Sequence, residues 1–276
     1  MPGTVRRAPF GFPAFRMALT FSARAIVLRT RQLGEKDRIL TLLSPDHGRF
    51  SAVAKGARNP KGKQAATSQP FVLARFLIAP GRSLHVASQS QIEDAHIHIC
   101  GDLVRTAWAS YICEMCDATP ESHPDSELFD ALEQALAALN EPESMPEQLE
   151  TAAAWFQIRF LHILGYEPTI GRCVVSGQKI TVDPADTTTK IAFSPALGGT
   201  LSASEVSRDP DRLTASVTAL RAMHTLGRAK APPRVLKLTP AARRDLRELL
   251  RRQIVVHLDA RLKSQKFLDD ILAANW

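Results

Sequence analysis

Five short segments between residues 23 and 92 decide the fold of this chain, because each has the length and apolar content of a β-strand. They are 24–30 (RAIVLRT), 39–43 (ILTLL), 49–55 (RFSAVAK), 71–78 (FVLARFLI) and 84–88 (LHVAS). The third segment alternates, with Phe50, Ala52 and Ala54 on one face and polar or larger residues on the other, as half-buried strands do. Glycine and proline separate the segments. Five strands within about 70 residues predict a small closed β-barrel.

From Asp102 onward the apolar residues recur every three to four positions, which is the period of an α-helix. The leucines of 128–139 follow this period. The apolar run 153–164 predicts a helix that stops at Gly165, because glycine is the usual residue just past a helix end. The chain therefore changes from strands to helices near residue 96.

The last third of the chain predicts a break followed by more helices. Residues 173–209 are rich in glycine and carry short β-like pieces at 174–175 and 191–193, so we expect an irregular segment there. Helices are expected to resume from Leu213. Thr239–Pro240 predicts a further helix start, with threonine as the cap and proline in the first turn, and this helix is expected to reach about Leu262.

Composition excludes several classes of protein. Hydrophobic residues make up 45% of the 276 positions and charged residues 23%, so wholesale disorder is excluded. No apolar run approaches the roughly 18 residues that a membrane helix needs. Four cysteines are too few for a disulfide-stapled fold, which favours a reducing cytoplasm. We expect residues 1–16, with their prolines, to be a disordered extension; both Met1 and Met17 are candidate start residues.

Charge is segregated along the chain. Residues 1–91 hold 15 Lys and Arg against three acids, residues 92–151 hold only Arg105 against 14 acids, and residues 152–276 hold 19 bases against 11 acids. A basic block within foldable sequence favours a polyanionic partner, most often nucleic acid. A solvated basic face without a partner is the alternative.

The motifs do not indicate an enzyme. We find no phosphate-binding glycine loop, dinucleotide fingerprint or nucleophile elbow. His96 and His98 would share a face on a strand, where they form either a metal pair or an exposed pair without a role. Cys113 and Cys116 have the spacing of half a zinc site or a redox pair, or are simply buried thiols within a helix. We expect no cofactor, no metal and no catalytic residue.

The candidate DNA-binding residues are basic. The segment 55–63 places four cations in nine residues, and we expect it to be a mobile loop that follows a phosphate backbone. The phenylalanines of the barrel region are expected in the core, which leaves no stacking platform and makes binding mainly electrostatic. The candidates in and around the barrel are Arg29, Arg31, Lys36, Arg49, Lys55, Arg58, Lys61, Lys63 and Arg82.

A second basic surface is expected on the helix that follows Thr239. Arg243, Arg247 and Arg251 recur every four residues opposite a leucine stripe, which predicts an amphipathic helix with a basic outer face. This face is either a second contact for nucleic acid or a solvated face paired with Asp245 and Glu248.

Several segments in a fixed order resemble the bacterial RecO family of recombination mediators. The resemblance covers about residues 22–270, and no single segment decides it. The segments are 25–28 (AIVL), 33–43 (LGEKDRILTLL), 48–58 (GRFSAVAKGAR), 69–71 (QPF), 160–168 (FLHILGYEP) with Cys173, 257–258 (HL), 262–264 (LKS) and 267–268 (FL).

The resemblance implies an α+β protein: an N-terminal OB-fold barrel over 17–95 and an α-helical domain over 96–276, with an insertion at 171–209. It also implies binding of single- and double-stranded DNA, annealing of complementary strands, and help in loading RecA together with RecR. The implied partners are DNA, RecR and single-stranded DNA-binding protein, with RecF as a further candidate, in the cytoplasm at the nucleoid. A protein scaffold that binds partners through its acidic helical domain, and a nucleic-acid enzyme with an unrecognised site, are the alternatives.

Many members of this family carry two Cys-x-x-Cys pairs that form a zinc site. The corresponding positions here are Cys173 and Ser176, then Ser202 and Glu205. One thiolate, two hydroxyls and a carboxylate are poor ligands for structural zinc. We therefore expect this insertion to keep its shape by packing.

Overall fold

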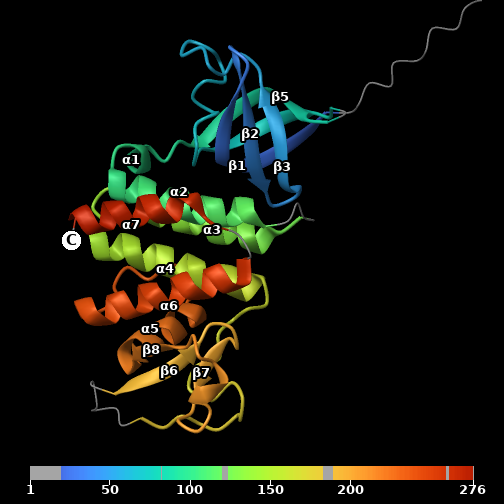
Figure 1. Ribbon diagram of the computed structural model, residues 1–276. Helices are drawn as coiled ribbons and strands as arrows, with labels where there is room; N and C mark the ends of the chain where they lie inside the picture. Colours follow the sequence, from blue (N-terminus) through green and yellow to red (C-terminus); the bar gives the residue numbers. More distant parts are fainter. Residues whose placement is uncertain (1–19, 82, 120–123, 183–188, 259–260, 276) are drawn as a thin grey trace, which may run out of the picture.

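The N-terminal part of the chain forms a closed five-stranded barrel in the computed structural model, which describes residues 20–81, 83–119, 124–182, 189–258 and 261–275. The strands follow the order β1-β2-β3-β5-β4, and the parallel pairing of β3 with β5 closes the barrel, as in an OB fold (Figure 1). All five predicted strands are confirmed. They are β1 (Phe21–Leu33), β2 (Asp37–Ser44), β3 (Gly48–Ala54), β4 (Leu73–Ala79) and β5 (His85–Asp94).

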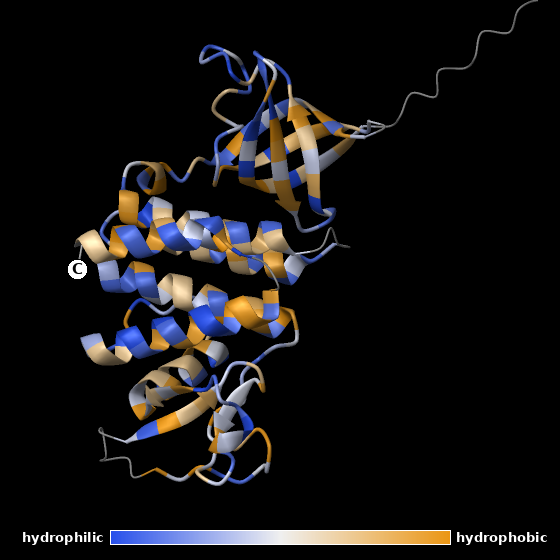
Figure 2. Ribbon diagram, in the orientation of Figure 1, coloured by the Kyte–Doolittle hydropathy of each residue, from blue (hydrophilic) through white to orange (hydrophobic). Residues whose placement is uncertain are grey.

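The barrel interior combines alanines with larger side chains such as Leu40, Leu42 and Phe76. Ala23 and Ala25 of β1 and Ala52 and Ala54 of β3 are fully or almost fully buried, and Arg24 and Val53 between them are only partly buried. Hydrophobic and hydrophilic positions are mixed along the barrel strands (Figure 2). Alanine suits this position because a five-stranded barrel leaves a narrow interior.

Helices make up most of the remaining chain and lie in layers below the barrel (Figure 1). The central layer contains α4, which is buried along most of its length. The helices are α1 (Ile97–Cys100), α2 (Leu103–Ala118), α3 (Ser126–Asn140), α4 (Pro146–Ile163), α5 (Val217–Arg228), α6 (Pro240–Leu258) and α7 (Lys263–Asn275).

Local signals set two helix ends as predicted. Gly165 follows α4 with a φ of +80°, a conformation that favours glycine. The hydroxyl of Thr239 accepts a hydrogen bond from the Ala242 amide at 3.2 Å at the start of α6. The prediction that this helix continues to Leu262 is wrong, because α6 ends at Leu258 and α7 is a separate helix.

A small three-stranded sheet lies at the far end of the helical layers, in the order β7-β6-β8 (Figure 1). Its strands are β6 (Lys190–Ser194), β7 (Gly199–Leu201) and β8 (Leu213–Ser216), and a short 3-10 turn, η1 (Val206–Arg208), precedes β8. The expectation that helix resumes at Leu213 is wrong, since β8 first pairs with β6 and Ser216 then caps α5. Four residues are too few to show a period in the sequence.

Side chains from both domains join the barrel to the helices. Ile26, Leu28 and Phe71 of the barrel region belong to the same hydrophobic core as Trp108 and Ile112 of α2. Contact between the domains therefore extends the core of the helical domain onto one wall of the barrel.

Ion pairs surround this shared core. Arg24 of β1 bonds Glu133 of α3 at 2.5 and 2.9 Å and Glu93 of β5 at 2.7 Å. Arg29 and Arg49 both pair with Asp117 of α2, at 3.0 and 3.4 Å. Acidic residues of the 92–151 segment thus neutralise bases of the barrel, which explains part of the charge segregation.

The histidine pair is not on a strand, contrary to the sequence expectation. His96 precedes α1 with a φ of +45° and is buried, and its Nδ1 lies 2.8 Å from the carbonyl oxygen of Phe71. His98 lies within α1 and is exposed. The two rings therefore do not share a face, and His96 has a structural role at the domain junction.

Candidate nucleic-acid interface

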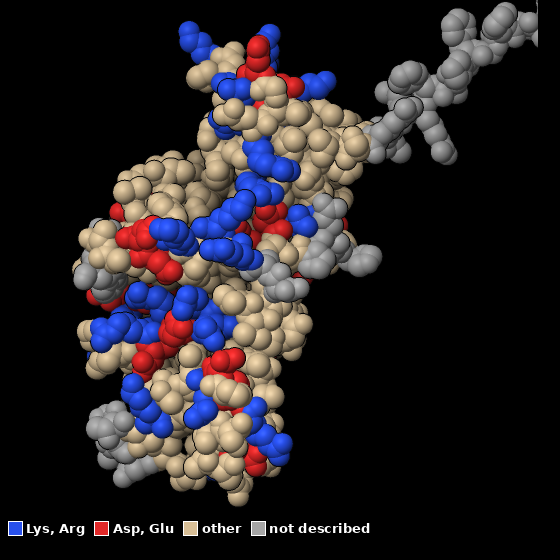
Figure 3. All heavy atoms as spheres, viewed as in Figure 1, with Lys and Arg blue, Asp and Glu red and all other residues tan. Residues whose placement is uncertain are grey.

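The segment 55–63, called the cationic loop below, lies at the end of the barrel away from the helices (Figure 1). Lysine and arginine side chains gather at this end (Figure 3). Lys55, Lys61 and Lys63 are exposed there. The loop is a series of turns in which the Asn59 amide bonds the Gly56 carbonyl at 3.1 Å and the Gly62 amide bonds the Asn59 carbonyl at 2.7 Å. Backbone hydrogen bonds thus order the turns of this loop, while its mobility stays a prediction.

Arg58 fastens the cationic loop to the turn between β1 and β2. Its guanidinium donates to the Gly34 carbonyl oxygen at 2.5 Å, and its amide donates to the Lys36 carbonyl oxygen at 3.0 Å. The Asp37 carboxylate also accepts from the Gly56 amide at 2.8 Å. Lys36 and the three lysines of the loop thus occupy one end of the barrel, with Arg58 acting mainly as the anchor between them.

The other candidate DNA-binding residues of the barrel differ in how exposed their side chains are. Arg31 is exposed on β1. Arg29 is 51% exposed despite its ion pair, whereas the Arg49 side chain is 14% exposed and also donates to the Thr119 carbonyl oxygen at 2.9 Å. Arg49 therefore acts within the protein, at the domain junction. Arg82 lies outside the described residues, as does the expected extension 1–16.

The arginines of α6 are mostly turned toward carboxylates. Glu150 of α4 has 8% of its side chain exposed, and it pairs with Arg243 at 3.6 Å and Arg247 at 2.8 Å. Arg251 pairs with Glu248 at 2.8 Å. The expected basic outer face is wrong for Arg243, whose side chain is 11% exposed, because the buried Glu150 draws it inward. A contact of α6 with DNA stays a prediction.

Aromatic side chains of the barrel gather at its other end. Phe71 and Phe76 are buried, as expected. Phe21 and Phe50 form a cluster with His47 and His85, whose ring centroids lie 4.4–6.3 Å apart. The cluster closes the barrel where β1 and β5 begin, far along the strands from the cationic loop.

Sequence reasoning missed a polar cleft beside the cationic loop. It has a volume of about 440 Å³ and is lined by Lys63, Gln64, Ser88, Gln89 and Ser90. The run SQSQ at 88–91 is an unusual neutral polar stretch for a strand, and it is the signal that could have pointed to this cleft.

The residues at the positions that correspond to the two Cys-x-x-Cys pairs do not fit zinc. Burial acts to raise the pKa of the Cys173 thiol, but hydrogen bonds from Ser176 and Ser202 outweigh it and lower the pKa to about 6. Glu205 instead pairs with Arg208 at 3.1 Å. Among the described residues, no three His, Cys, Asp or Glu side chains converge as a metal site would require. A single sulfur with hydroxyl neighbours leaves zinc without its usual ligands.

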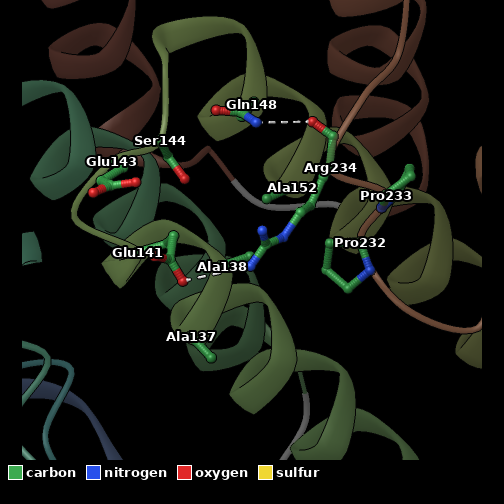
Figure 4. A pocket seen from close by; sticks show the side chains of 10 residues that line it. All are labelled: Ala137, Ala138, Glu141, Glu143, Ser144, Gln148, Ala152, Pro232, Pro233 and Arg234. Atoms are coloured by element: carbon green, nitrogen blue, oxygen red, sulfur yellow. Dashed lines mark hydrogen bonds and ion pairs between the residues drawn. The ribbon is translucent and has the colours of Figure 1, made fainter.

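A further pocket of about 400 Å³ opens between the end of α3, the start of α4 and residues 232–234 (Figure 4). The Gln148 side chain donates to the Arg234 carbonyl oxygen at 3.1 Å, and the Arg234 guanidinium lies 4.0 Å from Glu141 (Figure 4). Its lining combines Ser144, the carboxylates of Glu141 and Glu143, and the guanidinium of Arg234 with small apolar side chains.

Both halves of the chain match models of one protein family. Recombination protein O N terminal matches residues 17–96, and Recombination protein O C terminal matches residues 100–266. Among the described helices, none combines the length and apolar character needed to cross a membrane.

Three curated relatives share the name DNA repair protein RecO. The relative from Symbiobacterium thermophilum is 32% identical over 94% of this chain and 100% of its own length. The relative from Synechococcus elongatus is 32% identical over 94% and 98%, and that from Pelotomaculum thermopropionicum is 33% identical over 90% and 93%. An OB-type barrel joined to a helical domain is thus the architecture of a class of recombination and repair proteins. The chain belongs to the RecO family.

Proposed function

We propose that this chain binds single- and double-stranded DNA, anneals complementary strands and, together with RecR, helps load RecA during recombinational repair. The observation that supports this most directly is the cationic loop, whose exposed Lys55, Lys61 and Lys63 lie beside Lys36 at one end of the barrel. Cations held in a fixed arrangement can neutralise successive phosphates of a strand.

Binding through phosphates suits annealing. The basic end of the barrel is separated from the aromatic cluster around Phe21, and Phe76 is buried, so bases have little to stack on beside the cationic loop. Bases that remain unstacked on the protein are free to pair with a second strand.

A longer contact is available to double-stranded DNA. On the face seen in Figure 3, basic side chains continue from the barrel over the helical layers, with carboxylates among them. Arg244 is exposed on α6, and Arg251 retains 39% of its side-chain surface despite its ion pair. We propose single-stranded DNA-binding protein and RecR as protein partners, RecF as a further one, and a cytoplasmic, nucleoid-associated location.

The ion pairs of the acidic segment 92–151 weaken the alternative that this chain is a protein-binding scaffold. Asp117 and Glu150 are largely buried against arginines of this chain, and Glu133 pairs with Arg24. These carboxylates are thereby taken from an acidic docking surface, whereas others in the same segment, such as Asp130 and Glu143, are exposed.

The test measures how single-stranded DNA affinity depends on salt, by fluorescence anisotropy of labelled oligo(dT). If about five phosphates are neutralised, log K should fall with log[salt] with a slope of about −3.5, since each contributes ~0.7. Replacing Lys55, Lys61 and Lys63 with alanine should flatten the slope by up to ~2, again at ~0.7 per contact. Arg58 is left in place because it anchors the loop.

The matched control replaces Lys179, Lys190 and Lys230, which are also exposed but lie outside the barrel. It changes the net charge equally and should leave the slope unchanged. Equal slopes for the two triple variants would move the DNA site away from the loop, and a wild-type slope near zero would reject electrostatic binding. Strand annealing of complementary oligonucleotides and co-purification with RecR then test the remaining steps.

A further inference from the structure

The polar cleft beside β5 exists because the barrel seam opens. β3 pairs with β5 only from His85 to Ala87, and within the described residues no strand pairs with that edge of β5 beyond Ala87. The residues 63–67 lie there instead, where the Gln64 side chain donates to the Ala87 carbonyl oxygen at 2.7 Å and the Thr67 and Ser90 hydroxyls lie 2.7 Å apart.

A bulge in β5 shapes the cleft. Ala87 pairs with Ile78 and Gln89 pairs with Leu77, so Ser88 is an extra residue whose hydroxyl donates to the Leu77 carbonyl oxygen at 3.0 Å. Bulges re-aim neighbouring side chains and are frequent beside binding sites. Gln89 follows the bulge, is exposed, and makes no side-chain hydrogen bond within the described residues.

The chemistry of the lining is specific. It combines one cation, Lys63, with four neutral side chains that donate and accept hydrogen bonds, and it contains no carboxylate. The buried Oε1 of Gln64 has no hydrogen-bond partner in the described part of the chain. The volume of about 440 Å³ lies within the range of about 300–1,000 Å³ typical of small-molecule sites.

We infer that this cleft is a hydrogen-bonding subsite for one nucleotide unit of single-stranded DNA, with Lys63 on its phosphate and Gln89 on its sugar or base. The inference rests on the proposed DNA binding and adds to it a contact that does not depend on salt. Lys63 belongs to both the cationic loop and the cleft, so a strand that follows the loop enters the cleft at this residue.

A protein strand is a poorer occupant. Addition of a strand to a sheet needs a free run of backbone N–H and C=O groups. Here side chains of Gln64 and Thr67 cross that edge at Ala87 and Ser90. The edge is therefore interrupted at the positions where a new strand would have to bond.

The test compares Gln89→Ala with Gln91→Ala, which alters an exposed glutamine two residues further along the same strand and outside the cleft. Loss of a net hydrogen bond predicts about 2- to 12-fold weaker binding of oligo(dT) for Gln89→Ala. This factor should be the same at every salt concentration, so the slope of log K against log[salt] should equal that of wild type. Gln89→Glu should bind still more weakly at low salt, because a carboxylate then faces phosphate, and this excess loss should shrink as salt rises.

The control Gln91→Ala should bind as wild type, and melting curves should show that each variant is folded. Equal affinities of Gln89→Ala and Gln91→Ala would overturn the inference, even where the lysine variants flatten the salt slope as proposed. Loss of RecR binding with unchanged DNA affinity in Gln89→Ala would assign the cleft to a protein and also overturn it.

Discussion

Replacing Arg105 with methionine tests how far the helical domain depends on one buried cation. Arg105 is 7% exposed although it is the only base among residues 92–151. Its guanidinium lies at the connection between α3 and α4 and donates to four carbonyl oxygens. These are Leu139 and Glu141, both at 2.6 Å, Pro142 at 3.1 Å and Ser144 at 3.3 Å.

The magnitude follows from the two shortest bonds. A hydrogen bond from a charged donor contributes about 1.5–3 kcal/mol, so losing two of them costs about 3–6 kcal/mol. That is a large part of the roughly 5–15 kcal/mol by which a folded domain is stable. Arg105→Lys keeps the charge, but a single ammonium cannot reach all four carbonyls, and we expect about half of this loss.

Urea unfolding followed by tryptophan fluorescence measures the change, since Trp108 and Trp155 are buried in α2 and α4. Arg244→Met on the exposed side of α6 serves as the control and should change the unfolding free energy by less than ~0.5 kcal/mol. A loss below about 1 kcal/mol for Arg105→Met would refute the reasoning, because one unpaired charged bond alone should exceed it.

The remaining predictions concern the cysteines. Iodoacetamide should modify the exposed Cys100 in the native protein and spare Cys113 and Cys116, because burial raises the pKa of both buried thiols; peptide mass spectrometry showing equal labelling rates would contradict this. The pKa of Cys173 is lowered to about 6 when folded, so its thiolate stabilises the protein fully above the unfolded pKa of about 8.5 and loses this effect as pH falls through about 6. The difference in unfolding free energy between wild type and Cys173→Ser, measured with urea, should therefore grow from about pH 5 to about pH 9. A difference that shrinks over this range would contradict the lowered pKa of Cys173. Elemental analysis after dialysis against a chelator should find no stoichiometric zinc, and about one zinc per chain would refute the assignment of this site as metal-free.

Local sequence determined the barrel strands, two helix ends and the fold class of this protein. The alternation of Phe50, Ala52 and Ala54 predicts a strand with a buried face, and Gly165 and Thr239–Pro240 mark helix ends through backbone preferences that need no distant partner. The barrel followed by helices could be predicted for the same reason. Predictions were wrong where a short element depends on its neighbour, as β8 does on β6.

Only the tertiary structure decided which basic side chains are exposed and without an ion-pair partner in this chain. Arg49 and Arg247 look like Lys55 in the sequence, but their partners Asp117 and Glu150 lie 68 and 97 residues away and can be found only once the helices are packed. Arg105 shows the reverse, since it lies in the acidic segment 92–151 but its bonds go to carbonyls 34–39 residues away. The cleft beside β5 likewise depends on where β3 stops pairing with β5. Residue type sets the charge, whereas burial and distant partners decide whether that charge can reach another molecule.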